Sequence, residues 1–133
     1  MKQIIALILC CLALPAFDVK AANLDLTNDP ASGAPGEFAA EEIGREAKAK
    51  GMTLGEDAQA TRIALTVGTE SDAAVQSYRI RVRNAGGRRT ITGRGADAAG
   101  AMYGGLDVAD AIRTGMLDSL KDSDHTPHIA QRG

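Results

Sequence analysis

The sequence predicts a small α+β domain, with two helices packed on one face of a sheet that is at least partly antiparallel. Residues 37–50 and 97–114 have the apolar spacing of helices. Three short segments between them alternate apolar with polar residues, as strands do. The length of 133 residues suits one domain. The net charge of −2 gives no general reason to expect an anionic partner.

Residues 1–21 have the pattern of a secretory signal peptide. Lys2 precedes an apolar stretch at 4–14, and small residues flank Lys20 before the cleavage point. The stretch is too short to span a bilayer, although a retained membrane anchor and a lipoprotein site at Cys10 are the alternatives. We therefore expect a secreted or periplasmic protein with no membrane contact after signal cleavage.

Both cysteines of the chain, Cys10 and Cys11, fall inside this segment. Cleavage would leave 112 residues that can form no disulfide, thiol nucleophile or cysteine metal site. A chain of this size can be stable through packing alone.

Residues 22–36 are predicted to be a linker, because Pro30, Pro35 and nearby glycines favour turns. Leu24 and Leu26 alternate with polar neighbours, so a short edge strand is the alternative there. The folded domain is expected at residues 37–117.

The first helix is predicted at 37–50. Acidic residues fill its first turns, and Lys48 and Lys50 close it, which complements the helix dipole. Gly51 suits the left-handed position that ends many helices.

Strands are predicted at 62–67, 76–83 and 88–93, where apolar residues occupy every second position. The sequence Asn84-Ala85-Gly86-Gly87 separates the last two and is a hairpin signal. A second helix follows at 97–114, and a polar tail at 118–133 carries no predicted element.

The sequence Gly93-Arg94-Gly95 follows a strand and precedes a helix, which is the place of a dinucleotide-binding loop. The next glycine is Gly100, two positions later than that loop requires. We therefore interpret Gly95 as a turn residue and expect Gly100, Gly104 and Gly105 to allow close helix packing. No cofactor is predicted.

Arginines occupy alternate positions of the 76–83 strand, so Arg79, Arg81 and Arg83 would line one face of the sheet. This row is the candidate surface for an acidic ligand, such as an acidic glycan, or for an acidic partner domain. The alternative is a solvated sheet face whose like charges oppose aggregation. Nucleic acid is not expected, because the net charge is negative and aromatic residues are nearly absent nearby.

The two histidines, His125 and His128, lie in the polar tail near only Asp122 and Asp124. We interpret them as loop residues rather than as metal ligands, because a metal site needs more partners with fixed geometry. No set of carboxylates, and no Ser, His and Asp set, has a spacing that indicates catalysis.

Aromatic residues make up 3% of the chain, and those beyond the signal segment are Phe38, Tyr78 and Tyr103. All three lie beside apolar neighbours and are predicted to pack in the core. Because sugar-binding surfaces normally expose aromatic rings, this scarcity argues against a free-standing sugar-binding module.

Five segments of the chain follow one another in an order that matches a known domain. They are Phe38-Ala39-Ala40-Glu41-Glu42-Ile43, Arg62-Ile63-Ala64-Leu65, Tyr78-Arg79-Ile80, Ile91-Thr92-Gly93 and Gly100-Ala101-Met102-Tyr103-Gly104. This arrangement resembles the small α/β domain that precedes the catalytic barrel in α-glucuronidases, β-N-acetylhexosaminidases and related secreted glycoside hydrolases. The likeness covers residues 37–133.

In that family the domain is not catalytic and packs against the barrel. The 97–114 helix is apolar on two sides, and a helix of this kind usually has neighbours on both. The resemblance implies that one side covers the sheet and the other meets a barrel. Residues 127–133 resemble the approach to the first barrel strand, so Arg132 would contact substrate if a barrel follows.

We therefore expect a non-catalytic N-terminal accessory domain of a secreted glycoside hydrolase involved in polysaccharide degradation. The tail at 118–133 would lead into a catalytic barrel absent from this chain. A stand-alone exported protein that binds acidic glycans through the arginine row is the alternative, and an enzyme that acts alone is a third possibility.

Overall fold

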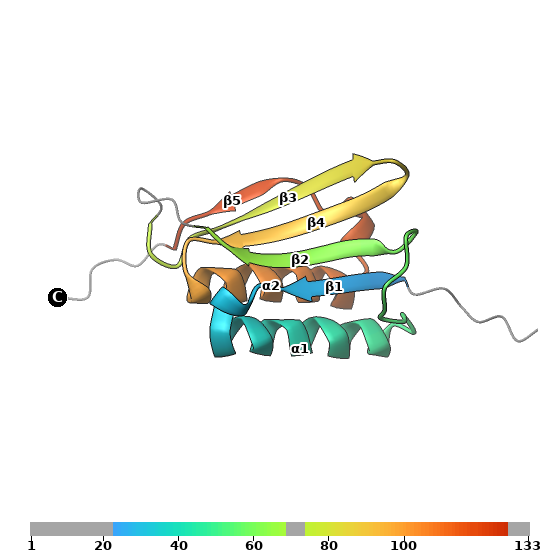
Figure 1. Cartoon of the computed structure of the whole chain (residues 1–133), viewed down its shortest axis with the longest axis horizontal. Coiled ribbons are helices and arrows are strands. Elements are labelled where there is room, and N and C mark those ends of the chain that lie inside the picture. Colours follow the sequence, from blue (N-terminus) through green and yellow to red (C-terminus); the bar gives the residue numbers. More distant parts are fainter. Residues whose placement is uncertain (1–22, 69–73, 128–133) are drawn as a thin grey trace, which may run out of the picture.

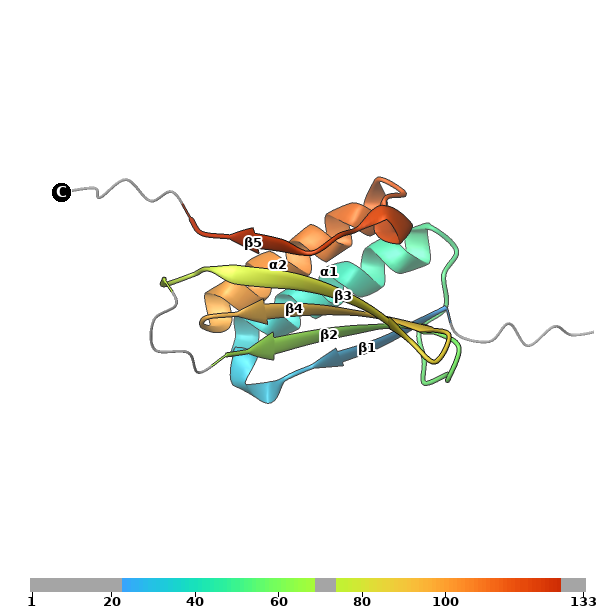
Figure 2. The same cartoon turned by 90° about the horizontal axis from the view of Figure 1, so that it is seen from above.

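The computed structural model describes residues 23–68 and 74–127. The predicted signal peptide, His128 and Arg132 lie outside these residues. The described chain forms one five-stranded sheet with both helices on the same face (Figures 1 and 2), which confirms the predicted fold class.

The sheet has the strand order β1-β2-β4-β3-β5. In chain order the elements are β1 (Leu24–Asn28), η1 (Pro30–Ser32), α1 (Gly33–Ala49), β2 (Thr61–Val67), β3 (Tyr78–Ala85), β4 (Arg88–Gly95), α2 (Ala98–Arg113), η2 (Leu117–Ser119) and β5 (Ser123–His125).

The sheet is mixed. Strands β1, β2 and β4 are parallel, whereas β3 pairs antiparallel with both β4 and β5. The predicted hairpin joins β3 to β4, and Gly86 and Gly87 adopt the positive φ angles, 59° and 76°, that such a turn requires. Strands β1 and β4 are each followed by a helix, and α1 and α2 lie side by side on one face of the sheet (Figure 1).

The core lies between the sheet and the two helices. Alternation in the strands buries one side chain in two on the helix-covered face, and both helices meet this layer. Its largest fully buried residues are Leu24, Ile43, Ile63, Leu65, Ile80, Ile91, Val108 and Ile112. The opposite face of the sheet has no helix over it in the described part of the chain (Figure 1).

Residues 23–36 are folded and do not form the predicted linker. Leu24–Asn28 is the edge strand that alternation allowed, and α1 begins at Gly33, four residues before the predicted start. Prolines are tolerated in the first turn of a helix, where the missing N–H group needs no partner. Pro35 lies in the first turn of α1, so it begins the helix and does not mark a loop.

The side of α2 that carries Ala101, Gly105, Val108 and Ile112 is buried within the domain, where the helix packs on α1 and on the sheet. This corrects the expectation that this second side meets a barrel. Tyr103, on the other apolar side, is 40% exposed. The buried residues are mostly small, among them Gly100, Ala101, Gly104 and Gly105, which lets the helices approach closely.

The tail is also more ordered than expected. Residues 117–119 form a turn, and Ser123–His125 pairs with β3 as the other edge strand of the sheet. Strand β5 is hard to predict from the sequence, because it is short and polar and its aspartate pairs with arginines of β3.

Candidate functional site

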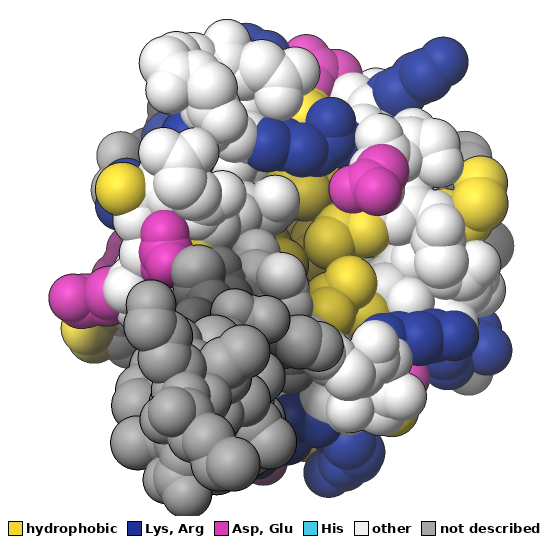
Figure 3. All heavy atoms as spheres, turned by 90° about the vertical axis from the view of Figure 1, so that its right-hand side faces the viewer, with side chains coloured by type: hydrophobic (Ala, Val, Ile, Leu, Met, Phe, Trp, Pro, Cys, Tyr) yellow, Lys and Arg dark blue, Asp and Glu magenta, His cyan; other side chains and the backbone are white. Residues whose placement is uncertain are grey.

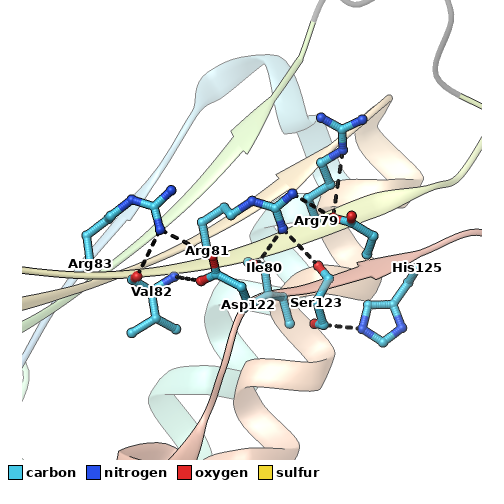
Figure 4. A network of polar contacts seen from close by, with 9 residues as sticks. Arg79, Ile80, Arg81, Val82, Arg83, Asp122, Ser123 and His125 are labelled. Atoms are coloured by element: carbon cyan, nitrogen blue, oxygen red, sulfur yellow. Dashed lines mark hydrogen bonds and ion pairs between the residues drawn. The ribbon is translucent and has the colours of Figure 1, made fainter.

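The predicted arginine row lies where the alternation placed it. Arg79, Arg81 and Arg83 project from β3 on the sheet face opposite the helices, with side-chain exposures of 52%, 33% and 67%. The side chains that face them come from the segment that contains β5 (Figure 4).

Two aspartates beside the row neutralise part of its charge. Arg81 Nη2 lies 2.7 Å from Asp124 Oδ1, and Arg83 Nη1 lies 3.2 Å from Asp122 Oδ2. Arg79 Nε is 3.9 Å from the Asp124 carboxylate. The row therefore contributes to holding β5 on the sheet. Because Arg81 and Arg83 already have carboxylate partners, the case for an acidic-ligand site on this row is weaker.

The Asp122 side chain also bonds to the backbone of β3, as a neighbouring strand would. Its Oδ1 accepts a hydrogen bond of 2.7 Å from the backbone N–H of Val82 (Figure 4). This bond, followed by the nearby Arg83 and Arg81, lowers the pKa of the Asp122 carboxyl below its ordinary value. Asp122 and Asp124 are thus partners of arginines.

The remaining arginines of the basic segment divide between the two faces of the sheet. Arg88 Nη2 donates to Asp25 Oδ2 at 2.7 Å on the open face. Arg89 Nη2 donates to the carbonyl oxygens of Leu117 and Leu120, at 3.1 and 2.9 Å, on the helix side. The basic run in the sequence is therefore not one surface.

A groove lies between α2 and β5 on the helix side of the sheet, on the face opposite the arginine row, and we name it the α2–β5 groove. It has a volume of about 570 Å³. Its lining residues are Gln76, Tyr78, Tyr103, Leu106, Asp107, His125, Thr126 and Pro127.

Three titratable side chains meet in this groove. The Tyr78 hydroxyl donates a hydrogen bond to Asp107 Oδ2, and the His125 ring stacks on the Tyr78 ring with centroids 4.6 Å apart and an interplanar angle of 11°. His125 Nε2 lies 2.9 Å from Ser123 Oγ and 3.9 Å from Asp107 Oδ2. Burial, and then the hydrogen bond and charge of Asp107, raise the pKa of Tyr78 above its ordinary value.

The groove offers binding groups but not the acid pair of a glycosidase. Asp107 is the one carboxylate among its described lining residues, whereas glycoside hydrolysis ordinarily uses two. Within the described part of the chain, no group of three His, Cys, Asp or Glu residues could hold a metal ion.

The structure changes the interpretation of three side chains, of which His125 and Tyr103 line the groove and Phe38 does not. His125 lies in a strand and stacks on Tyr78, so it is not the loop histidine that we expected. Tyr103 and Phe38 are 40% and 49% exposed, which corrects their assignment to the core. A lone aromatic at an outward helical position could have indicated this exposure for Phe38, which lies off the buried stripe of its helix.

The glycine-rich segment before α2 has a structural role. A Cβ on Gly95 would stand 2.0 Å from the backbone nitrogen of Ala101, and one on Gly100 would stand 2.2 Å from the carbonyl oxygen of Ser77. The strand end and the helix start are therefore packed too closely for side chains, as the structural interpretation of these glycines predicts.

A second hollow, of about 560 Å³, opens at the end of the molecule where α1 finishes. Figure 3 faces this end and shows hydrophobic side chains in a recess between charged ones. Its lining includes Leu24, Met52 and Leu117, with Lys50 and Asp118 as the titratable residues among those described. Its described lining has no aromatic side chain and no histidine, whereas the α2–β5 groove has both.

Comparison with solved structures finds a similar fold inside a larger enzyme. The chain is similar to a GH138 enzyme targeting pectin rhamnogalacturonan II, with a TM-score of 0.61 and 18% sequence identity. The likeness covers 80% of this chain and 16% of that enzyme. At this identity it shows the fold alone, which therefore also occurs within a glycoside hydrolase.

Comparison by sequence adds nothing to this likeness. No protein-family model matches the chain, and no curated protein matches it. Among the helices of residues 23–68 and 74–127, none has the length and apolar character needed to cross a membrane.

Proposed function

We propose that this chain is an exported, non-catalytic accessory domain of a polysaccharide-degrading glycoside hydrolase, and that it supports a catalytic barrel in that enzyme. The observation that carries the proposal is the likeness to a unit that makes up 16% of a GH138 enzyme. A fold that occupies so small a share of an enzyme leaves room for a separate catalytic domain.

The chemistry of the described surface agrees with a non-catalytic role. The α2–β5 groove holds one carboxylate among its described lining residues. Asp122 and Asp124, in the segment that contains β5, pair with arginines of β3. A general acid and a second carboxylate facing one sugar ring would be needed for hydrolysis. The proposed barrel supplies them.

A binding role for the arginine row is less well supported. An acidic glycan would have to compete with Asp122 and Asp124 for Arg83 and Arg81. Surface ion pairs are weak, at about 0–1 kcal/mol each, but a ligand gains little by replacing one carboxylate with another. We therefore retain the accessory domain as the single proposed function.

Turnover by the purified chain is the first test. We expect no release of reducing ends from pectic or neutral polysaccharides beyond that of the heat-denatured chain. The coding DNA that adjoins this segment is expected to encode a barrel with two carboxylates in its site. Sustained turnover by this chain, or adjoining DNA that encodes no such domain, would count against the proposal.

A further inference from the structure

The α2–β5 groove combines an exposed aromatic side chain with polar groups. Tyr103 lines it and is 40% exposed, and the half-buried Tyr78 ring lies deeper, stacked on His125. The apolar face of a sugar ring packs on an aromatic face, while its hydroxyl groups reach hydrogen-bonding partners at the edge. Both kinds of contact are available here.

The polar partner is the carboxylate of Asp107. Its side chain is 44% exposed, and its contacts with Tyr78 and His125 both use Oδ2. A carboxylate has two oxygens that accept hydrogen bonds. Oδ1 can therefore accept a hydrogen bond from a ligand hydroxyl while Tyr78 holds the group in place.

A hydrogen bond to Asp97 holds the backbone of Gln76 at the groove. Gln76 has a φ angle of 64°, which is unfavourable for a residue with a side chain, and it lines the groove. Its backbone N–H donates a 2.9 Å hydrogen bond to Asp97 Oδ2, and Asp97 also caps α2. Strained residues that the surrounding structure holds in place are concentrated at binding sites.

Charge decides which sugars fit. Among the described residues that line the groove, none is Lys or Arg, whereas Asp107 is acidic. A uronate carboxylate would meet the like charge of Asp107, and the described lining offers no Lys or Arg to pair with it. An uncharged pyranose would meet hydrogen-bonding groups, aromatic faces and the apolar side chains of Leu106 and Pro127.

From this geometry we infer that the α2–β5 groove binds an uncharged sugar ring, with Tyr103 as the stacking surface and Asp107 as the hydrogen-bond acceptor. The choice of a saccharide over another hydroxylated ring rests on the proposed function. In that function the domain would hold a neutral part of the polysaccharide.

Titration of the full chain, followed by NMR, tests this inference. The neutral probes are the methyl glycosides of galactopyranose, rhamnopyranose and xylopyranose. The methyl glycoside of galacturonic acid is the charged control, because it differs from the galactoside by its carboxylate. We expect at least one neutral probe to shift the signals of Gln76, Tyr103 and His125 with a Kd on the order of millimolar. The galacturonide should bind at least about fivefold more weakly.

Matched variants assign the effect to the groove. Tyr103→Ala should weaken binding at least about fivefold, and Tyr103→Phe should restore most of it because the ring is retained. Phe38→Ala changes an exposed aromatic on α1 and should leave Kd unchanged. The inference is overturned if no neutral probe shifts these signals, if the galacturonide binds equally well, or if Tyr103→Ala has no effect.

The outcomes also separate this inference from the proposed function. If a barrel in the complete enzyme protects the amides of the groove, the groove is a docking surface and the sugar site is wrong, although the accessory role stands. If the sugar binds and no barrel adjoins this segment, the accessory role fails and the site stands.

Discussion

Gly105 of α2 lies directly against Ala39 of α1, so closely that a Cβ on Gly105 would stand 2.7 Å from the Ala39 Cβ. The same Cβ would stand 3.0 Å from Leu65 Cδ1 of β2. Gly105 therefore marks a point where α2 approaches both α1 and β2 too closely for a side chain.

Gly105→Ala should destabilise the domain by about 1–3 kcal/mol, because the added methyl group overpacks the contact between the helices. Gly44→Ala is the matched control, since its Cβ would meet only Leu54 Cδ1 at 3.4 Å. This change should be neutral or stabilise α1 by up to about 1 kcal/mol through helix propensity. Urea denaturation of both variants measures the difference. Equal effects would show that the helices are not in close contact at Gly105.

Asp97→Ala should cost about 1–2 kcal/mol. Asp97 Oδ1 accepts a 2.8 Å hydrogen bond from the N–H of Gly100, and Oδ2 accepts one from Gln76. Asp97→Asn keeps one acceptor oxygen and should lose less. The midpoint of thermal unfolding measures both changes, and an Asp97→Ala variant as stable as the parent chain would mean that the cap is not formed.

Alkaline unfolding should depend on Tyr78. Its pKa in the folded domain is raised above the ordinary value of about 10, chiefly by burial and then by Asp107. The unfolded chain therefore loses this proton first, and the stabilisation present below about pH 10 declines as the pH rises further. In Tyr78→Phe the alkaline fall in the free energy of unfolding should be smaller.

Urea denaturation of the parent chain and Tyr78→Phe at about pH 8 and about pH 11 gives this comparison. Asp107→Asn should give an intermediate result, because it removes the carboxylate charge and leaves the burial. Identical alkaline losses in all three proteins would mean that the Tyr78 phenol is not buried against Asp107.

Acid should release β5 from the sheet. The pKa of Asp122 is lowered in the folded domain, first by the Val82 N–H and then by Arg83 and Arg81. The contribution of this carboxylate is complete above the unfolded value of about 3.9, and it is lost as the pH falls through the lower folded value. Asp122→Asn should produce at neutral pH the loosening that acid produces in the parent chain.

Hydrogen exchange of the Val82 amide reports this change directly, because Asp122 is its hydrogen-bond acceptor. Exchange should be faster in Asp122→Asn. Asp118→Asn removes an exposed carboxylate in η2 and should leave the rate unchanged. An unchanged rate in Asp122→Ala, which leaves the Val82 N–H without this acceptor, would disprove the role of the side chain in holding β5.

Local patterns predict this fold where they are strong. The structure confirms three such predictions. Alternation predicts the buried face at Ile63 and Leu65, the glycines predict the β3–β4 hairpin, and the glycines of α2 predict close helix packing. The start of α1 was obscured, because Pro35 can begin a helix or mark a loop. Strand β5 has no apolar pattern of its own.

The candidate site was harder to predict, since its parts are distant in the chain. Tyr78 and Asp107 are 29 positions apart, and Arg81 meets Asp124 only after β5 adds to the edge of the sheet. The alternation predicts the face on which the arginine row lies, but it does not predict that Asp122 and Asp124, in a tail with no predicted element, neutralise that row. Pairing across the sheet, which the sequence does not reveal, brings these groups together.

The central claim is that this domain stabilises a catalytic barrel and supplies no catalytic group. Calorimetry and turnover of the complete enzyme, with and without residues 23–127, test it most directly. Removal should lower the midpoint of barrel unfolding by several degrees, at about 2–4 °C for each 1 kcal/mol lost in a domain of that size, while kcat per folded molecule is unchanged. A barrel of undiminished stability, or a kcat that falls with every molecule folded, would contradict it.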